Sequence, residues 1–315
     1  MASFGADGNN VVIAQKHFPM RAEAVPPQAY FVGSAIFHYL GPSFAVLLFA
    51  RVEPLGVAWL RITTAAAVFA AWRRPWRGLR WLDRAGWLLI GGLATVFALM
   101  NACFYLAIDR LPLAMVAAIE FVGPVILALR GARVPRNFLA VGAAAGGVYL
   151  LTHVRLVNHP VGVAFAAANA ALFTAYVVLA HRVSRRPGFG GVDGLAAAML
   201  LAFVIVSPIG LGSAVHAFGD PLVLAAGAGV GISSSVIPYV FDQLAMARLP
   251  RATYALFVAL LPATATVIGV VVLQQVPSAV DLAGIALVML AIALHQPDRT
   301  SKRELQQLSS EVHTA

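Results

Sequence analysis

The chain has 315 residues, of which 60% are hydrophobic and only 11% are charged, and its formal net charge is +9. A soluble domain averages about 25% charged residues, so this composition excludes an ordinary soluble protein and indicates one that lies in a bilayer. The positive charge does not indicate nucleic-acid binding, because the basic residues lie in short clusters between apolar runs.

The apolar runs predict an all-α integral membrane protein. Residues 1–28 contain no apolar segment of a signal peptide, so we expect a cytoplasmic N-terminal segment. A spanning helix needs about 20 mainly apolar residues. Residues 296–315 are polar and are expected to form a cytoplasmic tail. Between them the sequence predicts ten transmembrane helices, over residues 30–49, 55–72, 86–108, 111–130, 137–152, 160–181, 194–211, 222–246, 251–273 and 279–295.

The distribution of lysine and arginine predicts the orientation of these helices. If both termini are cytoplasmic, eighteen of the 22 basic residues fall on the cytoplasmic side, and only Arg51, Arg110 and Arg155 fall on the other. The remaining basic residue, Arg61, lies inside a predicted span. This bias follows the positive-inside rule. We therefore expect a multi-pass protein of the cytoplasmic membrane with both termini in the cytoplasm.

An internal repeat divides the chain. The tripeptide Arg-Leu-Pro at residues 110–112 recurs at residues 248–250, and the same offset of 138 residues maps Pro124 onto Pro262. Each half then has five predicted helices. Because five is odd, the second half enters the membrane from the opposite side.

The sequence thus predicts two inverted five-helix repeats, over residues 29–152 and 153–295. Inverted repeats are an architecture of secondary transporters, in which the substrate site lies near the midplane at the repeat interface. Because two related but non-identical halves can each open to one side, this architecture predicts alternating access.

Three charged side chains fall within the predicted spans: Arg61, Glu120 and Asp242. Charges in hydrocarbon are costly, and a functional role is the default interpretation. Arg61 follows Pro54 by seven residues and Glu120 follows Pro112 by eight, so both lie about 10–12 Å from the same membrane face at 1.5 Å per residue. They are expected either to form a structural ion pair or to bind and couple a substrate, with Glu120 also a candidate proton carrier.

Uncharged polar residues extend this predicted site. Asn101 and Tyr105 lie four residues apart and share one helix face near the depth of Glu120. Tyr239 lies in the eighth predicted helix. A buried Asn must find hydrogen bonds, and for Asn101 both a substrate and a neighbouring helix remain open as partners.

Four further residues are candidates for gating. Pro124 and Pro262 each remove a backbone hydrogen bond and are predicted hinges. Asp242 is either an inner gate or a group that reaches the membrane surface. His38 is either a proton relay or a packing residue.

The sequence lacks the motifs that are typical of soluble enzymes and of phosphate- or metal-binding sites. It contains no phosphate-binding loop, no His/Cys cluster with metal-ligand spacing and no Gly-x-Ser-x-Gly nucleophile motif. No metal or cofactor is therefore expected. A membrane-embedded enzyme is the least favoured function, because the histidines are scattered over different predicted helices.

Three stretches of the first half resemble a known family. They are MNACFYL at residues 100–106, LPL at 111–113 and IEFVGP at 119–124. Together with Ile-Pro-Tyr at 237–239 and the second Arg-Leu-Pro, they resemble the EamA branch of the drug/metabolite transporter superfamily, and within it the threonine/homoserine exporter group. The resemblance implies ten helices in two inverted repeats and export of small metabolites. It carries over five candidate binding or coupling residues: Arg61, Asn101, Tyr105, Glu120 and Tyr239.

The second half departs from the pattern of that group. Leu261-Pro262 stands where the group usually has Glu-Pro, and Gln274-Gln275 stands where it usually has Gly-Glu. The expected function is export of a small, threonine- or homoserine-like amino acid or related metabolite, with proton coupling and oligomeric state left open. The alternative is broad-specificity efflux of drugs or metabolites.

Overall fold

The computed structural model describes residues 25–80, 82–123, 135–184, 191–246 and 257–294. Within these ranges the chain forms helices joined by short connections, with no β-strand, so the all-α prediction is confirmed for this part of the chain. At least one of these helices overlaps each of the ten predicted spans, and the crossing of the membrane by each span stays a prediction. The helices are α2 (Pro27–Leu48), α3 (Pro54–Arg73), α4 (Trp76–Leu79), α5 (Arg84–Ile108), α6 (Leu113–Glu120), α8 (Pro135–Asn158), α9 (Pro160–Ser184), α10 (Gly191–Ala214), the 3₁₀-helix η2 (Val215–Gly219), α11 (Pro221–Gly231), the π-helix η3 (Ile232–Val236), α12 (Ile237–Met246), α14 (Leu261–Leu273) and α15 (Ala279–Leu294).

Proline and aspartate define where several helices begin. Pro27, Pro54 and Pro221 lie in the first turn of α2, α3 and α11, where a missing N–H costs nothing. The Asp83 carboxylate accepts a hydrogen bond from the Gly86 N–H at the start of α5. Such N-caps satisfy donors that a helix end leaves free.

Among the described residues, six helical stretches are long and apolar enough to cross a membrane. α14 and α15 are shorter apolar helices. This finding supports a multi-pass membrane protein. The six stretches are Pro27–Leu48, Pro54–Arg73, Arg84–Ile108, Pro160–Val183, Val192–Gly219 and Pro221–Asp242.

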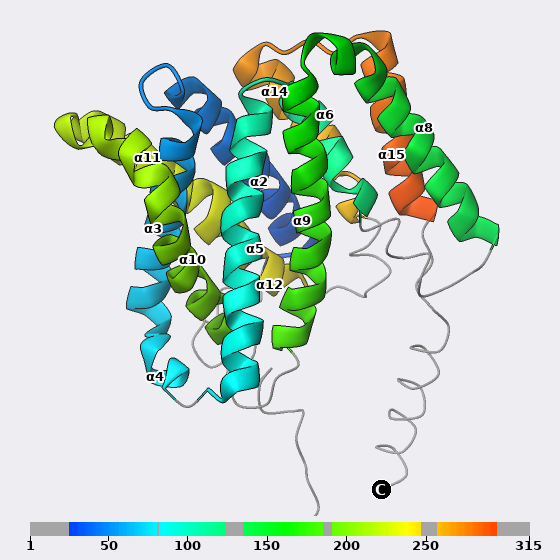
Figure 1. Cartoon of the computed structure of the whole chain (residues 1–315). Helices are drawn as coiled ribbons and strands as arrows, with labels where there is room; N and C mark the ends of the chain where they lie inside the picture. Colours follow the sequence, from blue (N-terminus) through cyan, green and yellow to red (C-terminus); the bar gives the residue numbers. More distant parts are fainter. Residues whose placement is uncertain (1–24, 81, 124–134, 185–190, 247–256, 295–315) are drawn as a thin grey trace, which may run out of the picture.

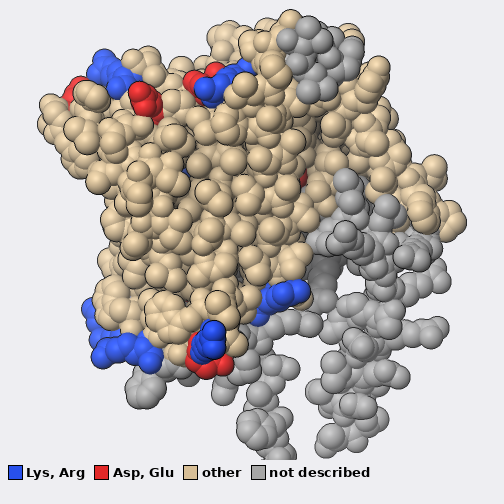
Figure 2. All heavy atoms as spheres, viewed as in Figure 1, with Lys and Arg blue, Asp and Glu red and all other residues tan. Residues whose placement is uncertain are grey.

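The long helices run roughly alongside one another, with α8 and α15 packed together at one edge and α3 beside α10 at the other (Figure 1). Between these pairs, α5 packs against α9 and α2 against α12. Charged side chains gather at the two ends of the face drawn in Figure 2, and the broad band between them is largely uncharged. This distribution suits a protein whose middle lies in hydrocarbon.

Small residues let the helices approach closely at the centre. A Cβ atom added at Gly41 of α2 would come within 2.7 Å of the backbone nitrogen of Ser234 in η3. Backbone atoms cannot move aside as the end of a flexible side chain can. Gly41 therefore permits α2 and η3 to pack at a distance that no other residue allows.

Gly41→Ala is expected to destabilise the protein by about 1–3 kcal/mol, the usual cost of overpacking. The matched control is Gly91→Ala in α5, because a Cβ added at Gly91 meets nothing within 4 Å. Both changes gain the same helix propensity, so their difference isolates the packing cost. Thermal unfolding in detergent should show a lower Tm for Gly41→Ala alone, and equal Tm values would contradict the close approach.

Candidate functional site

Arg61 lies at the centre of a buried polar cluster. It is the eighth residue of α3 and is only 7% exposed. Its Nε donates a hydrogen bond to Ser235 Oγ at 3.0 Å, and its Nη2 donates one to the carbonyl oxygen of Ser234 at 3.1 Å. The guanidinium is thus held by η3, on the other half of the chain.

The local sequence explains why Ser234 has a free carbonyl. In an α-helix this oxygen would accept from the N–H four residues later, but residue 238 is proline and has none. The chain forms a π-helical turn, η3, which ends at Val236, two residues before this proline. π-Turns inside helices are frequent at functional sites.

Glu120 lies on a different helix and does not pair directly with Arg61. It is the last residue of α6 and is 7% exposed. Within the described residues, no ion pair within 4.0 Å joins the two side chains, and the Asn169 side chain lies beside the Glu120 carboxyl group. The two charges nevertheless lie within electrostatic range of each other. The structure therefore brings a buried cation and a buried anion near each other without neutralising either.

The two predicted residues of α5 have different surroundings. The Cζ atom of Arg61 lies 5.6 Å from the centre of the Tyr105 ring, and the buried Tyr105 hydroxyl has no hydrogen-bond partner within 3.5 Å in the described part of the chain. Asn101, which is 2% exposed, donates from Nδ2 to the Phe97 carbonyl of its own helix at 2.8 Å. Tyr105 therefore borders the charged cluster, whereas the Asn101 amide is engaged locally.

The remaining predicted residues are distributed around this centre. His38 is half-buried in α2 and Tyr239 is half-buried in α12, and both lie within electrostatic range of Arg61. Asp242 lies one turn beyond Tyr239 and within electrostatic range of it. Pro262 is buried in the first turn of α14, immediately after the turn at residues 259–260. Pro124 lies outside the described residues.

Sequence reasoning missed two members of the cluster. Asn169 of α9 is fully buried beside the Glu120 carboxyl group, and Tyr39 of α2 is fully buried within electrostatic range of the same carboxyl group. Asn169 is a polar residue inside an apolar run, the same signal that drew attention to Asn101. Tyr39 gives no such signal, because tyrosine is common in apolar helices.

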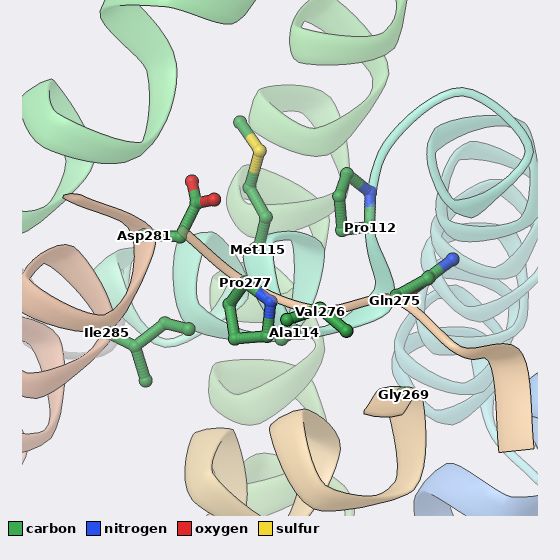
Figure 3. Close-up of a pocket in the computed structure, with 9 residues that line it drawn as sticks. All are labelled: Pro112, Ala114, Met115, Gly269, Gln275, Val276, Pro277, Asp281 and Ile285. Atoms are coloured by element: carbon green, nitrogen blue, oxygen red, sulfur yellow. The ribbon is translucent and has the colours of Figure 1, made fainter. Parts of the chain in front are cut away.

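A separate pocket lies at the opposite end of α6 from Glu120, between α6, α14 and α15 (Figure 3). Gln275 Oε1 accepts a hydrogen bond from the Leu113 N–H at 3.0 Å, which satisfies a donor at the start of α6. The carboxylate of Asp281 already accepts from the backbone and hydroxyl of Ser278. This pocket therefore offers no free charge. Its lining residues are Pro112, Ala114, Met115, Gly269, Gln275, Val276, Pro277, Asp281 and Ile285.

The described residues contain no group of three or more His, Cys, Asp or Glu side chains that could hold a metal ion. What the central cluster offers is one guanidinium, one carboxylate and several neutral hydrogen-bonding groups. Such a set can bind a small polar molecule that carries both charges. It holds no nucleophile activated by a neighbouring base, as covalent catalysis would require.

Comparison with known proteins gives consistent results. Residues 160–295 match the EamA-like transporter family. The threonine/homoserine exporter RhtA of Escherichia coli K12 is 31% identical over 258 residues, which cover 80% of this chain and 84% of the relative. RhtA of Salmonella typhimurium LT2 is 30% identical over 258 residues, which cover the same fractions of this chain and of the relative. A crystal structure of a protein with 21% sequence identity superposes with a TM-score of 0.52 over 85% of this chain and 97% of its own.

These relatives cover most of the chain. They are transporters, so the expectation that the chain is not an enzyme is confirmed. The resemblance noted in the sequence is also confirmed. The chain belongs to the EamA-like transporter family.

Proposed function

We propose that the chain is a secondary transporter that exports a threonine- or homoserine-like amino acid across the cytoplasmic membrane. The observation that carries this proposal is the unpaired arrangement of Arg61 and Glu120. Both are buried, and neither forms an ion pair with the other. An α-amino acid carries a carboxylate for the guanidinium and an ammonium group for the carboxylate, and both interactions would be strong in a site shielded from water.

The two exporters named above support this substrate class, since RhtA is a threonine/homoserine exporter in both organisms. Arg61 also argues against broad efflux of cationic drugs. A lone buried carboxylate would suit a cationic drug, but a guanidinium within electrostatic range of it would repel the same molecule.

Alternating access between two inverted five-helix repeats, residues 29–152 and 153–295, is the mechanism that we propose. The packing of the helices supports it. α3 packs against α10, α6 against α14 and α8 against α15, and in each pair one helix is the repeat counterpart of the other. Counterparts become neighbours when two halves are related by a two-fold axis, as in transporters built from inverted repeats.

Interrupted helices give independent support for the repeats. α6 ends at Glu120 with a turn at Phe121, and a turn at residues 259–260 precedes α14. The offset of 138 residues maps 121 onto 259, so the two breaks occupy equivalent positions. Discontinuous helices in corresponding positions of two halves point to the binding site of a secondary transporter. Pro124 and Pro262, next to these breaks, are the proposed hinges.

The proposed topology has ten spans with both termini in the cytoplasm. It predicts that a reporter fused after Thr300 is active on the cytoplasmic side and inactive on the outer side. Paired alkaline phosphatase and fluorescent protein fusions measure both outcomes. An outward location of this fusion would contradict an even number of spans that begins in the cytoplasm.

The proposed function is tested by efflux from cells preloaded with a panel of labelled amino acids. Expressing cells should release threonine or homoserine faster than cells that carry an empty vector. Addition of a proton uncoupler then distinguishes proton-coupled export from facilitated diffusion. Equal efflux from the two kinds of cell across the whole panel would refute export of amino acids.

A further inference from the structure

Asn169 is a buried amide with no hydrogen-bond partner within 3.5 Å among the described residues. It lies in α9, its exposed fraction is 0%, and neither Nδ2 nor Oδ1 has a hydrogen-bond partner among the described residues. Buried polar side chains normally have at least one partner, so each exception needs an explanation. The cost of an unsatisfied amide inside a membrane protein indicates that a ligand completes it in some state of the transport cycle.

The position of Asn169 indicates which ligand. The amide lies beside the Glu120 carboxyl group. The Tyr39 hydroxyl, which is also fully buried and has no partner in the described ranges, lies within electrostatic range of the same carboxyl group. Three elements of the fold, α2, α6 and α9, thus bring a hydroxyl group, a carboxyl group and an amide to one place.

The hydrogen-bonding chemistry of the two amide atoms of Asn169 narrows the choice of ligand group further. Nδ2 lacks an acceptor and Oδ1 lacks a donor. An ammonium group only donates and a carboxylate only accepts, whereas a hydroxyl group does both. The proposed function already assigns the charged ends of the substrate to Arg61 and Glu120. A hydroxyl group is therefore what remains for Asn169, and this conclusion holds whichever way the amide is turned.

We propose that Asn169 is a specificity-determining residue that binds the side-chain hydroxyl group of the exported amino acid, with the Tyr39 hydroxyl as its neighbour. This inference rests on the proposed function of the same site. It makes a distinct claim, because it assigns discrimination between substrates, rather than transport itself, to one residue of α9.

Threonine and valine provide the test, since valine has a methyl group in place of the threonine hydroxyl. The assay measures initial rates of efflux of each labelled amino acid from proteoliposomes. The unaltered protein should prefer threonine by roughly 10-fold or more, the expected effect of a buried hydrogen bond that only one substrate can make. Asn169→Leu, which keeps the size but removes both polar atoms, should bring the ratio close to one by slowing threonine export.

The matched control is Thr174→Val on the same helix. The Thr174 hydroxyl donates to the Ala170 carbonyl at 2.8 Å and is therefore already satisfied. This variant should keep the threonine preference. Because the readout is a ratio, a reduced amount of folded protein does not alter it, and Asn169→Ala provides a second variant should Asn169→Leu fail to fold.

The possible outcomes separate the two proposals. A ratio near one in Asn169→Leu, with the preference intact in Thr174→Val, supports the assignment. An unchanged ratio, or an equal fall in both rates, assigns Asn169 a structural role and overturns this inference alone. Failure of the unaltered protein to export either threonine or homoserine overturns the proposed function and this inference with it.

Discussion

Arg61→Leu is expected to lower the rate of amino-acid export by roughly 100-fold or more. Breaking a buried, hydrogen-bonded charge interaction typically costs about 3–5 kcal/mol, and each 1.4 kcal/mol corresponds to about tenfold. The change removes the bonds to Ser235 Oγ and to the Ser234 carbonyl. It also removes the cation that would bind the substrate carboxylate. The measurement is the initial efflux rate per amount of protein in the membrane.

Arg61→Lys separates charge from geometry. Lysine keeps the positive charge but cannot reproduce the fixed pair of N–H donors of a guanidinium. We expect it to recover only part of the rate. Full recovery would mean that the two bonds to η3 contribute little, and that Arg61 acts through its charge alone.

Arg51→Leu is the control for a general loss of positive charge. Arg51 forms an exposed ion pair with Asp220 at 3.4 Å, with side-chain exposures of 60% and 43%. Exposed pairs contribute about 0–1 kcal/mol, so export should be unchanged. A wild-type rate for Arg61→Leu, at a normal level of protein in the membrane, would contradict a role for Arg61 in the site.

The apolar runs predicted the helices well because the bilayer imposes a simple rule. A stretch of about 20 apolar residues must satisfy its backbone hydrogen bonds internally, and a helix is the local way to do so. The prediction was less accurate where a helix is interrupted. α6 ends at Glu120, within the span expected over 111–130, and the span over 222–246 contains the π-turn of η3.

The sequence predicted the central charges but not their partners. The matched positions of Arg61 and Glu120 followed from counting residues after Pro54 and Pro112, and both side chains are the eighth residues of their helices. Their separation did not follow. The separation of Arg61 from Glu120 depends on a backbone carbonyl that Pro238 leaves without its usual N–H partner. Pro238 lies 177 residues after Arg61 in the sequence.

Asn169 shows the same limit of sequence reasoning. Its polarity within an apolar helix can be read from the sequence alone. The position of its amide beside Glu120, a residue 49 positions earlier, depends on how α6 packs against α9. The same holds for Asn101, whose amide turned out to bond to its own helix at Phe97.

Glu120→Gln is expected to abolish the dependence of export on a proton gradient. Glu120 is a buried carboxyl group that forms no ion pair among the described residues, so a proton can bind it without breaking one. The titratable groups within its electrostatic range are Arg61, Tyr39 and Tyr239. Glutamine keeps the shape of the side chain but cannot exchange a proton.

Proteoliposomes with an imposed pH difference measure this effect. A transporter that exchanges one substrate for one proton can sustain a substrate ratio of about tenfold per pH unit, because both gradients then store about 1.4 kcal/mol. The unaltered protein should approach this tenfold ratio of substrate concentrations across the membrane per pH unit. The Glu120→Gln variant should instead let the substrate reach equal concentrations on the two sides. Asp220→Asn, which changes an exposed carboxylate at a helix end, should retain the full response. If Glu120→Gln retained it as well, the proton would have to be carried elsewhere, and Glu120 would serve substrate binding alone.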